Sequence, residues 1–570
     1  MNINKFIILV FLISGETISS FSQKSAGKIN PYSYTVTKKV ECINGAVVSA
    51  HPLATKVGVY ILQKGGNAVD AAIAVQLALA VVYPGAGNIG GGGFMVARLQ
   101  NGKTIALDYR ETAPAKASKD MYLDKNGDVI SSKSKDGHLS AGVPGTIAGL
   151  FASMKYAKLP FKDLIQPAID LAEKGFVITE REAKNLNDSL GAFVKNNSKL
   201  NTFIKLGGWK SGDTLIQKDL AATLKRIQQL GQKGFYEGIT AKLIVDEMKR
   251  GNGIISLNDL KNYKAKEREA INFDYKGYTI ITMPLPSSGG PILQEMMNMV
   301  SSKNISGKGF QTFGSVQLMT EVERRAYADR AEFLGDPDFV KVPLKKLTSY
   351  EYALERMKDY DSTKASNSKE VKAGNINKES EQTTHLSVID KEGNMVSVTT
   401  TLNGGYGSKT VVAGAGFLLN NEMDDFSAKP GVPNLYGAVG NEQNAIAPNK
   451  RMLSSMTPAL VLKNNEPFLV VGTPGGTTIT TSVFQTLMNV LEFGMNADDA
   501  VNKPKFHHQW LPDVVYVEKD FSKTVSEELK KAGYQVVERM PIGRTELIMI
   551  ENKKITAVGD KRGDDTAEGY

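Results

Sequence analysis

Cysteine is almost absent from this sequence, since Cys42 is the only one among 570 residues. A single cysteine excludes any internal disulfide. Cys42 also lies too far from the apolar N-terminal run to be a lipid-attachment site at the end of that run. An exported protein that is stable without disulfides is typical of a bacterial periplasm or of a secreted bacterial protein.

A long hydrophobic run is lacking as well. The N-terminal stretch "FIILVFLIS", Phe6 to Ser14, is far shorter than the ~20 apolar residues of a membrane helix. Lys5 precedes it, and small residues at Ser20 and Ser22 have the spacing of a signal-peptidase site. We therefore predict a signal peptide over residues 1–22 and no membrane anchor.

The charge and histidine patterns lack the marks of nucleic-acid and metal binding. The 69 Lys and Arg residues are spread among 60 Asp and Glu residues, without an arginine-rich arm or zinc-finger spacing. Adjacent His507 and His508 lack an H-E-x-x-H context. We therefore expect no nucleic-acid partner and no metal, and a structural role for these two histidines.

One glycine-rich stretch matches a cofactor motif. Gly85, Gly87 and Gly90 in "GAGNIGGGGF" have the G-x-G-x-x-G spacing of dinucleotide-binding loops. That loop requires a strand before the glycines and a helix after them, whereas a helical pattern precedes them here and the strand-like "FMVARL" follows. We therefore predict no nicotinamide or flavin cofactor and interpret these glycines as sites of close backbone packing.

A polar stretch divides the chain into two unequal parts. "DSTKASNSKEVKAGNINKESEQ", Asp361 to Gln382, contains almost no apolar residues and buries too little surface to offset the entropy of ordering it. We predict a mobile linker or a processing site here. Helical patterns dominate before it, and strand patterns begin directly after it.

The first strand pattern is a hairpin. "THLSVID" and "MVSVTTT" flank the turn "KEGN". Centring the turn between Glu392 and Gly393 pairs Thr384 with Thr401. Thr401 is therefore expected to lie opposite Thr383, to within about one residue, at a separation of roughly 5 Å.

A second hairpin repeats this arrangement. "MTPALVLK" and "PFLVVGT" flank "NNE", and taking Asn465 as the centre places Ser455 opposite Gly475. The "PGG" of Pro474 to Gly476 then leads into a helical pattern. Backbone N–H groups of Gly475 and Gly476 at such a helix entry are suited to form an oxyanion hole.

A threonine hydroxyl needs a neighbouring base to act as a nucleophile. The α-amino group of an N-terminal threonine, with a reference pKa near 7.7 to 8.0, provides such a base. Thr383 acquires that group only if the Gln382–Thr383 bond is cut, and attack of its hydroxyl on the Gln382 carbonyl followed by ester hydrolysis achieves this. Strand propensity alone also explains a threonine pair at this point.

Several further blocks resemble γ-glutamyltranspeptidases, which are N-terminal-nucleophile hydrolases. They are "DYRETAP", "TTHLSVID", "TLNGGYGS", "GFLLNNEMDDFSAKPGVPN", "PNKRMLSSMTP", "GTPGGTTI" and "FHHQWLPD", in the order of the family and spread between about Val47 and Tyr570. The resemblance implies an α+β fold, the four-layer αββα sandwich. It also implies a heterodimer of a large subunit, 23–382, and a small catalytic subunit, 383–570, cut from one precursor.

The resemblance assigns roles to individual residues. It implies that Thr383 is the nucleophile after cleavage at Gln382–Thr383 and that Thr401 hydrogen-bonds to it. The residues expected to contact substrate are Arg110, Ser454 and Ser455 for an α-carboxylate; Asn403, Glu422 and Asp425 for an α-ammonium; Gly475 and Gly476 for the oxyanion; and Tyr436 as the gate of a lid loop over 429–445. Glu422 departs from many bacterial members, which carry glutamine there.

The function implied is transfer of the γ-glutamyl group of glutathione and related amides to water, amino acids or peptides, without a cofactor. Two alternatives remain. One is a cephalosporin or glutaryl acylase, against which Asp425 argues because a glutaryl side chain has no ammonium group. The other is an uncleaved, inactive homologue that acts as a binding protein.

Overall fold

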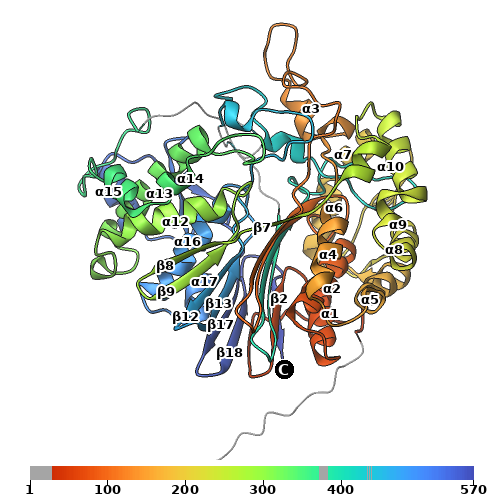
Figure 1. The fold of residues 1–570 in the computed structure, drawn as a ribbon, viewed down its shortest axis with the longest axis horizontal. Coiled ribbons are helices and arrows are strands. Elements are labelled where there is room, and N and C mark those ends of the chain that lie inside the picture. Colours follow the sequence, from red (N-terminus) through yellow and green to blue (C-terminus); the bar gives the residue numbers. More distant parts are fainter. Residues whose placement is uncertain (1–28, 372–382, 433, 435–436, 438–439) are drawn as a thin grey trace, which may run out of the picture.

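The computed structural model describes residues 29–371, 383–432, 434, 437 and 440–570. Within this part of the chain, two antiparallel sheets of seven strands each lie face to face, and helices cover both outer faces (Figure 1). The α+β fold and the αββα layers expected from the resemblance are confirmed. The predicted signal peptide, residues 1–22, lies outside the described residues.

The first sheet contains the strand that begins beside Thr383. Its order is β19 (Thr566–Gly569), β2 (Ala46–Ser49), β10 (Thr384–Ile389), β11 (Met395–Thr401), β3 (Gly92–Arg98), β4 (Thr104–Asp108) and β7 (Lys266–Arg268). The order of the second sheet is β1 (Lys39–Cys42), β18 (Lys554–Gly559), β17 (Glu546–Glu551), β13 (Glu466–Gly472), β12 (Ala459–Lys463), β9 (Tyr278–Thr282) and β8 (Ile271–Tyr275). Each sheet therefore combines strands from both sides of the predicted cut.

The helices outside the first sheet come from the N-terminal half of the chain. They are α1 (Pro52–Gln63), α2 (Ala68–Val82), α4 (Thr146–Ser153), α5 (Phe161–Lys174), α6 (Glu180–Asp188), α7 (Leu190–Asn196), α8 (Lys218–Leu230), α9 (Lys233–Tyr236) and α10 (Gly238–Arg250), with α3 (Ser131–Lys135) and α11 (Leu257–Asn262) nearby. All residues of α2 are buried, and it begins at a capping box in which the Asn67 side chain accepts from the Asp70 backbone N–H. This helix packs against β10 and β11 and supports the hairpin from outside.

The helices outside the second sheet come from both sides of the predicted cut. They are α12 (Gly289–Ser301), α13 (Phe313–Phe333), α14 (Leu344–Leu347), α15 (Tyr350–Arg356), α16 (Thr478–Leu491), α17 (Ala497–Asn502) and α18 (Lys523–Lys531). Short strands β14 (Phe506–His507), β15 (Val515–Glu518) and β16 (Val536–Arg539) form a small sheet, and β5 (Phe176–Val177) pairs with β6 (Thr214–Leu215).

The interface between the two large sheets is partly polar. Apolar residues such as Phe94 and Leu460 fill much of it. Around the β10–β11 hairpin, however, Ser387 Oγ donates to the Glu546 carbonyl at 3.1 Å and Ser397 Oγ donates to the Val471 carbonyl at 3.1 Å. These bonds join the hairpin to the opposite sheet and fix its position in the core.

The first half of the predicted linker is held in place. In residues 361–371, Ser368 is buried and hydrogen-bonds to Arg324, and its carbonyl accepts from Trp510 Nε1 at 2.9 Å. The prediction of mobility is therefore wrong for 361–371, because backbone and hydroxyl groups of this polar stretch find buried partners. Residues 372–382 lie outside the described part of the chain.

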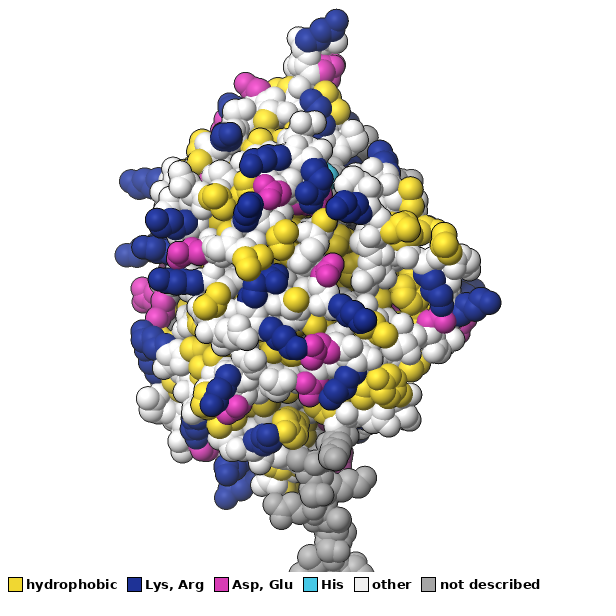
Figure 2. Space-filling model, turned by 90° about the vertical axis from the view of Figure 1, so that its right-hand side faces the viewer, with side chains coloured by type: hydrophobic (Ala, Val, Ile, Leu, Met, Phe, Trp, Pro, Cys, Tyr) yellow, Lys and Arg dark blue, Asp and Glu magenta, His cyan; other side chains and the backbone are white. Residues whose placement is uncertain are grey.

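The surface carries both signs of charge. On the face drawn in Figure 2, Lys and Arg side chains are scattered among acidic, apolar and uncharged ones and do not gather in one patch. Among the helices that the structure describes, none is both long enough and apolar enough to cross a membrane.

Candidate active site

Thr383 lies at the open end of the β10–β11 hairpin. The register pairs Thr384 with Thr400, and the Thr383 and Thr401 hydroxyl oxygens are 3.4 Å apart. The expectation that these two side chains stand opposite each other, to within one residue, is confirmed. Thr401 Oγ1 also accepts from the Asn403 backbone N–H at 2.7 Å, which fixes the hydroxyl beside Thr383.

The glycine pair lies in the loop that connects β13 to α16. The second hairpin has the expected register, with Ala459 opposite Val471, and α16 begins at Thr478. Gly475 and Gly476 have φ values of 138° and 55°. A side chain at Gly475 would collide with the Thr478 hydroxyl, so both the backbone conformation and the available space require glycine there.

The two glycines face the site from different sides. Gly476 lines a small cavity together with Thr383, whereas Gly475 lines a neighbouring, larger cavity that also includes Thr383. The loop ends at the N-terminus of α16, where the helix dipole favours negative charge. This arrangement is suited to stabilise an oxyanion that forms beside the Thr383 hydroxyl.

The small cavity brings together residues that are far apart in the sequence. Besides Thr383 and Gly476, its lining includes these charged and polar residues: Arg110, Arg330, Thr401, Asn403, Glu422, Asp425, Asn434, Ser454 and Ser455. All residues predicted to hold the substrate α-carboxylate and α-ammonium therefore converge here. Tyr436, the predicted gate, and Gln382, the residue before the predicted cut, lie outside the described residues.

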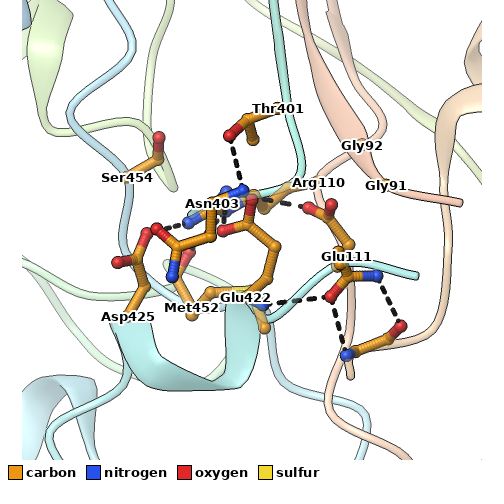
Figure 3. A network of polar contacts seen from close by, with 12 residues as sticks. Gly91, Gly92, Arg110, Glu111, Thr401, Asn403, Glu422, Asp425, Met452 and Ser454 are labelled. Carbon is orange, nitrogen blue, oxygen red and sulfur yellow. Dashed lines mark hydrogen bonds and ion pairs between the residues drawn. The ribbon is translucent and has the colours of Figure 1, made fainter. Parts of the chain in front are cut away.

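Arg110 is the centre of an ion-pair network (Figure 3). Its Nη1 lies 2.5 Å from Glu422 Oε2, and its Nη2 lies 2.5 Å from Asp425 Oδ2. Glu111 Oε2 is 3.7 Å from Nη1, and Arg110 Nε donates to the Met452 carbonyl at 3.3 Å. Because Glu422 and Asp425 belong to one short 3₁₀ helix, Glu422–Asp425, they reach the same guanidinium together.

Acidic groups outnumber the single guanidinium in this network. Burial raises the pKa of Glu422 well above its usual range and that of Asp425 above its usual value, and it raises the pKa of Glu111 to about 8. Arg110 is shared among these three carboxyl groups, and Arg330 adds a second positive charge near Asp425. An additional cation bound here would favour their ionised forms, so the network is electrostatically suited to an ammonium group.

Arg330 is a functional candidate that the sequence did not reveal. It lies in α13, is buried, and donates to Ser288 Oγ at 2.9 Å and to Ser455 Oγ at 3.2 Å. No carboxylate among the described residues lies within ion-pair distance of it, and burial lowers its pKa. A charged residue on a helix usually faces solvent, so the sequence pattern of "VERRAYADRAEFLG" contained no signal for this role.

The serines and Asn403 are held by backbone contacts. Ser454 Oγ accepts from the Met456 backbone N–H at 3.2 Å, and the Ser454 carbonyl accepts from Ser288 Oγ at 2.6 Å. Asn403 has a φ of 72°, and its Nδ2 donates to the Asn421 carbonyl at 3.0 Å. Ser454, Ser455 and Arg330 thus form a donor-rich side of the cavity, opposite in charge to the acidic side.

His507 and His508 have structural surroundings. His507 hydrogen-bonds to Thr481 and Gln509, and His508 contacts Asp513 at 3.2 Å. Burial lowers the pKa of His507 to about 3 and that of His508 to about 4, so both are neutral at neutral pH. Among the residues that the structure describes, no group of three or more His, Cys, Asp or Glu side chains is arranged to hold a metal ion.

Comparison with known proteins identifies similar sequences and structures. A family model described as gamma-glutamyltranspeptidase matches residues 54–570. The glutathione hydrolase proenzyme of Escherichia coli K12 is 45% identical over 574 residues, which cover 99% of this chain and 98% of that protein. The structure of γ-glutamyltranspeptidase from Helicobacter pylori is 46% identical with a TM-score of 0.56, covering 57% of this chain and 94% of that one. A cephalosporin acylase structure from Bacillus halodurans has a TM-score of 0.81 at 26% identity, covering 95% and 99%.

Proposed function

Because this chain belongs to the γ-glutamyltranspeptidase family, we propose that Thr383 is the nucleophile with which it acts as a γ-glutamyltransferase and glutathione hydrolase. One observation carries the assignment: the Thr383 hydroxyl lies 3.4 Å from that of Thr401, at a point shared by a cavity suited to an amino-acid head group and a loop suited to an oxyanion. No other threonine in the described residues lines both cavities.

Self-cleavage comes first, which is supported by the description of the 45% identical Escherichia coli relative as a proenzyme. The Thr383 hydroxyl oxygen attacks the Gln382 carbonyl carbon, the peptide C–N bond breaks, and the nitrogen takes the hydroxyl proton and becomes an amine. Water then hydrolyses the resulting ester, which restores the hydroxyl and leaves a carboxylate on Gln382. The products are subunits 23–382 and 383–570, and Thr383 gains the α-amine that acts as its base.

Acyl transfer uses the same two groups of Thr383. The α-amine takes the hydroxyl proton while the oxygen attacks the γ-carbonyl of the donor, and the N–H groups of Gly475 and Gly476 stabilise the oxyanion. Collapse expels the leaving amine, which accepts the proton, and leaves a γ-glutamyl ester on Thr383. Attack on this ester by water or by an acceptor amine releases glutamate or a new γ-glutamyl amide and restores Thr383.

The donor head group binds by its two charges. Its α-ammonium joins Glu422 and Asp425, where buried acidic groups exceed the available positive charge. Its α-carboxylate lies against Arg110, Ser454 and Ser455, and we add Arg330 to this set because it contacts Ser455 and has no carboxylate partner in the described structure. Fixing both charges positions the γ-carbonyl at Thr383. Asn403 completes the ammonium side, and Tyr436 is proposed as the gate.

The cellular setting follows from the N-terminal sequence. Removal of residues 1–22 on export would leave Gln23 as the first residue of the large subunit and place the enzyme in the periplasm or outside the cell. There it would meet glutathione, other γ-glutamyl compounds and amino-acid or peptide acceptors.

N-terminal sequencing of the purified protein tests the nucleophile. Wild-type material should give two chains that begin at Gln23 and Thr383, whereas Thr383→Ala should stay uncut. Thr384→Val is a matched control, because the Thr384 hydroxyl is buried without a hydrogen bond in the described structure and the substitution keeps its shape. A single persistent wild-type chain would contradict the mechanism and favour a non-catalytic binding protein.

Substrate class is tested with two chromogenic anilides. The acidic side of the head-group cavity predicts that a γ-glutamyl anilide, which has an α-ammonium, is hydrolysed far faster than a glutaryl anilide, which has none. Preference for the glutaryl compound would identify an acylase instead.

A further inference from the structure

The glycine-rich stretch before β3 packs against the end of the strand that carries Thr401. A Cβ at Gly91 would lie 2.1 Å from the Thr401 carbonyl oxygen, so only glycine fits at this position. Asn88 belongs to the same stretch, is buried, and contacts Thr401. We propose that Asn88 is a positioning residue for self-cleavage and for transfer, and that it keeps the Thr401 hydroxyl in place beside Thr383. The proposal rests on the proposed role of Thr383.

Both polar atoms of the Asn88 side chain are engaged. Its Oδ1 accepts from the Gly91 backbone N–H at 3.0 Å and from Thr146 Oγ1 at 2.7 Å. Its Nδ2 donates to the Thr401 carbonyl at 2.9 Å and lies 3.2 Å from Thr400 Oγ1. Because a backbone N–H can only donate, the Gly91 contact identifies the amide oxygen, and the amide N–H groups must face Thr400 and Thr401.

The N-terminus of α4 supports the glycine-rich stretch from the other side. The backbone N–H groups of Gly145 and Thr146 donate to the Gly91 carbonyl at 2.7 Å and 3.0 Å. Asn88 and Thr146 lie before the predicted cut, whereas Thr401 lies after it. These hydrogen bonds therefore join the two proposed subunits, and they do not depend on the bond that is cut.

Thr401 is the last residue of β11, at the point where the chain leaves the sheet. Asn88 holds its carbonyl, and the Asn403 backbone N–H donates to its hydroxyl at 2.7 Å. With both groups fixed, the hydroxyl lies 3.4 Å from that of Thr383. A displacement of about 1 Å near reacting atoms can cost about 100-fold in rate. A loosely held Thr401 should therefore slow both reactions that begin at the Thr383 hydroxyl.

Asn88 acts through Thr401 and not on the substrate. It is not among the described residues that line the head-group cavity or the larger cavity beside it. Loss of its contact with Thr401 should therefore change the rate of the chemical steps and leave substrate affinity unchanged.

An isosteric substitution tests this separation. Asn88→Asp keeps the size of the side chain and the oxygen that accepts from Gly91, but it removes the N–H groups that face Thr401. Self-cleavage and kcat for the γ-glutamyl anilide should each fall about tenfold, the size expected for a buried hydrogen bond, with the KM unchanged. Self-cleavage is followed on gels with chain synthesised in a cell-free system, and kcat and KM are measured on the cut enzyme.

A double-mutant cycle separates positioning from general damage. Thr401→Val removes the hydroxyl that Asn88 is proposed to position. Adding Asn88→Asp to Thr401→Val should slow self-cleavage little further. Independent effects multiply, so a full tenfold additional loss in the Thr401→Val background would overturn the positioning role.

A second variant and a control complete the test. Thr146→Val removes the hydroxyl that holds Asn88 Oδ1 without touching Thr401, and it should lower kcat about threefold at unchanged KM. Asn489→Asp makes the same change of amide to acid at a buried asparagine near the end of α16, whose Nδ2 donates to the Ala500 carbonyl at 3.1 Å, and it should behave as wild type.

Two results would contradict the role of Asn88. Equal losses in Asn88→Asp and Asn489→Asp would assign the effect to general destabilisation. If Asn88→Asp yields no folded protein, a wild-type kcat in Thr146→Val would overturn the proposal. Failure of the wild-type chain to cut itself and to release any γ-glutamyl group would instead refute the proposed role of Thr383.

Discussion

Two cavities meet at Thr383 and differ in size and charge. The head-group cavity is small, about 30 Å³, and its central guanidinium, Arg110, already contacts two carboxylates. The neighbouring cavity is about 220 Å³ and is lined by Arg181 and Arg544, which have only long contacts to acids, and by Arg562, which is closely paired with acids. Thr383 is common to the linings of both.

The difference in charge determines which ligand chemistry each cavity suits. A small cavity with both signs of charge suits a ligand that has an ammonium and a carboxylate, as a γ-glutamyl head group does. The neighbouring cavity is larger, and its described lining contains arginines and no acidic side chain.

The largest effect is expected on the donor side. Asp425→Asn removes one of the two carboxylates that would hold the substrate ammonium and should lower kcat/KM for the γ-glutamyl anilide by about 100-fold, because breaking a buried charge pair costs ~2–5 kcal/mol. Steady-state kinetics at saturating acceptor measure this loss. Asp425 is not among the described residues that line the neighbouring cavity, so the loss concerns the head-group cavity alone.

The neighbouring residue is the control for this substitution. Asp424 accepts from Ser134 Oγ at 2.5 Å and does not line the head-group cavity. Asp424→Asn should therefore retain most of the donor affinity. Equal losses in both variants would show that general damage to the 3₁₀ helix, and not the ammonium contact, causes the effect.

A smaller donor-side effect is expected from the carboxylate contact. Arg330→Gln should raise the KM for the γ-glutamyl anilide about tenfold, the size expected for one hydrogen bond to a charged group. Arg330→Lys should restore part of the affinity. With a donor in which an amide replaces the α-carboxylate, the wild type and Arg330→Gln should have similar KM values. A persistent tenfold difference in KM would mean that Arg330 only supports Ser288 and Ser455.

The smallest effect concerns stability and pH. Burial raises the pKa of Glu111 to about 8 from its usual 4.5, so the folded protein binds more protons than the unfolded chain between these values. Stability from this group is present at low pH and is lost as the pH rises through that window. The urea midpoint of Glu111→Gln should therefore fall less between pH 5 and pH 8 than that of the wild type. Arg181→Gln alters the cavity on the other side of Thr383 and should keep the wild-type change of the urea midpoint with pH.

The hairpins were the most predictable part of the site. Turn residues and alternating strands set the register by counting, and the observed pairs, Thr384 with Thr400 and Ala459 with Val471, lie within one residue of that count. Hairpin contacts are local, so they depend on a few neighbouring residues. The positive φ of Gly475 is equally a local requirement that the sequence expresses directly.

Long-range contacts were less predictable. Arg330 and Asn434 reach the head-group cavity from segments whose sequence patterns indicate only a helix and a loop. Likewise, the polar composition of 361–371 predicted mobility, yet Trp510 and Arg324 provide buried partners for Ser368. Trp510 lies 142 residues from Ser368 and Arg324 lies 44 residues from it, and composition contains no information about such partners.

By itself, the sequence determined the hairpin at Thr383, the glycine loop before α16 and, through its resemblance, the family and the αββα layers. Only the tertiary structure decided that Arg110 faces an excess of acids, that Arg330 joins the same cavity, and that Arg181 and Arg544 meet across a second one. The physical reason is that register follows from local backbone geometry, whereas the charge of a cavity is the sum of side chains from segments that only the packed sheets and helices bring together.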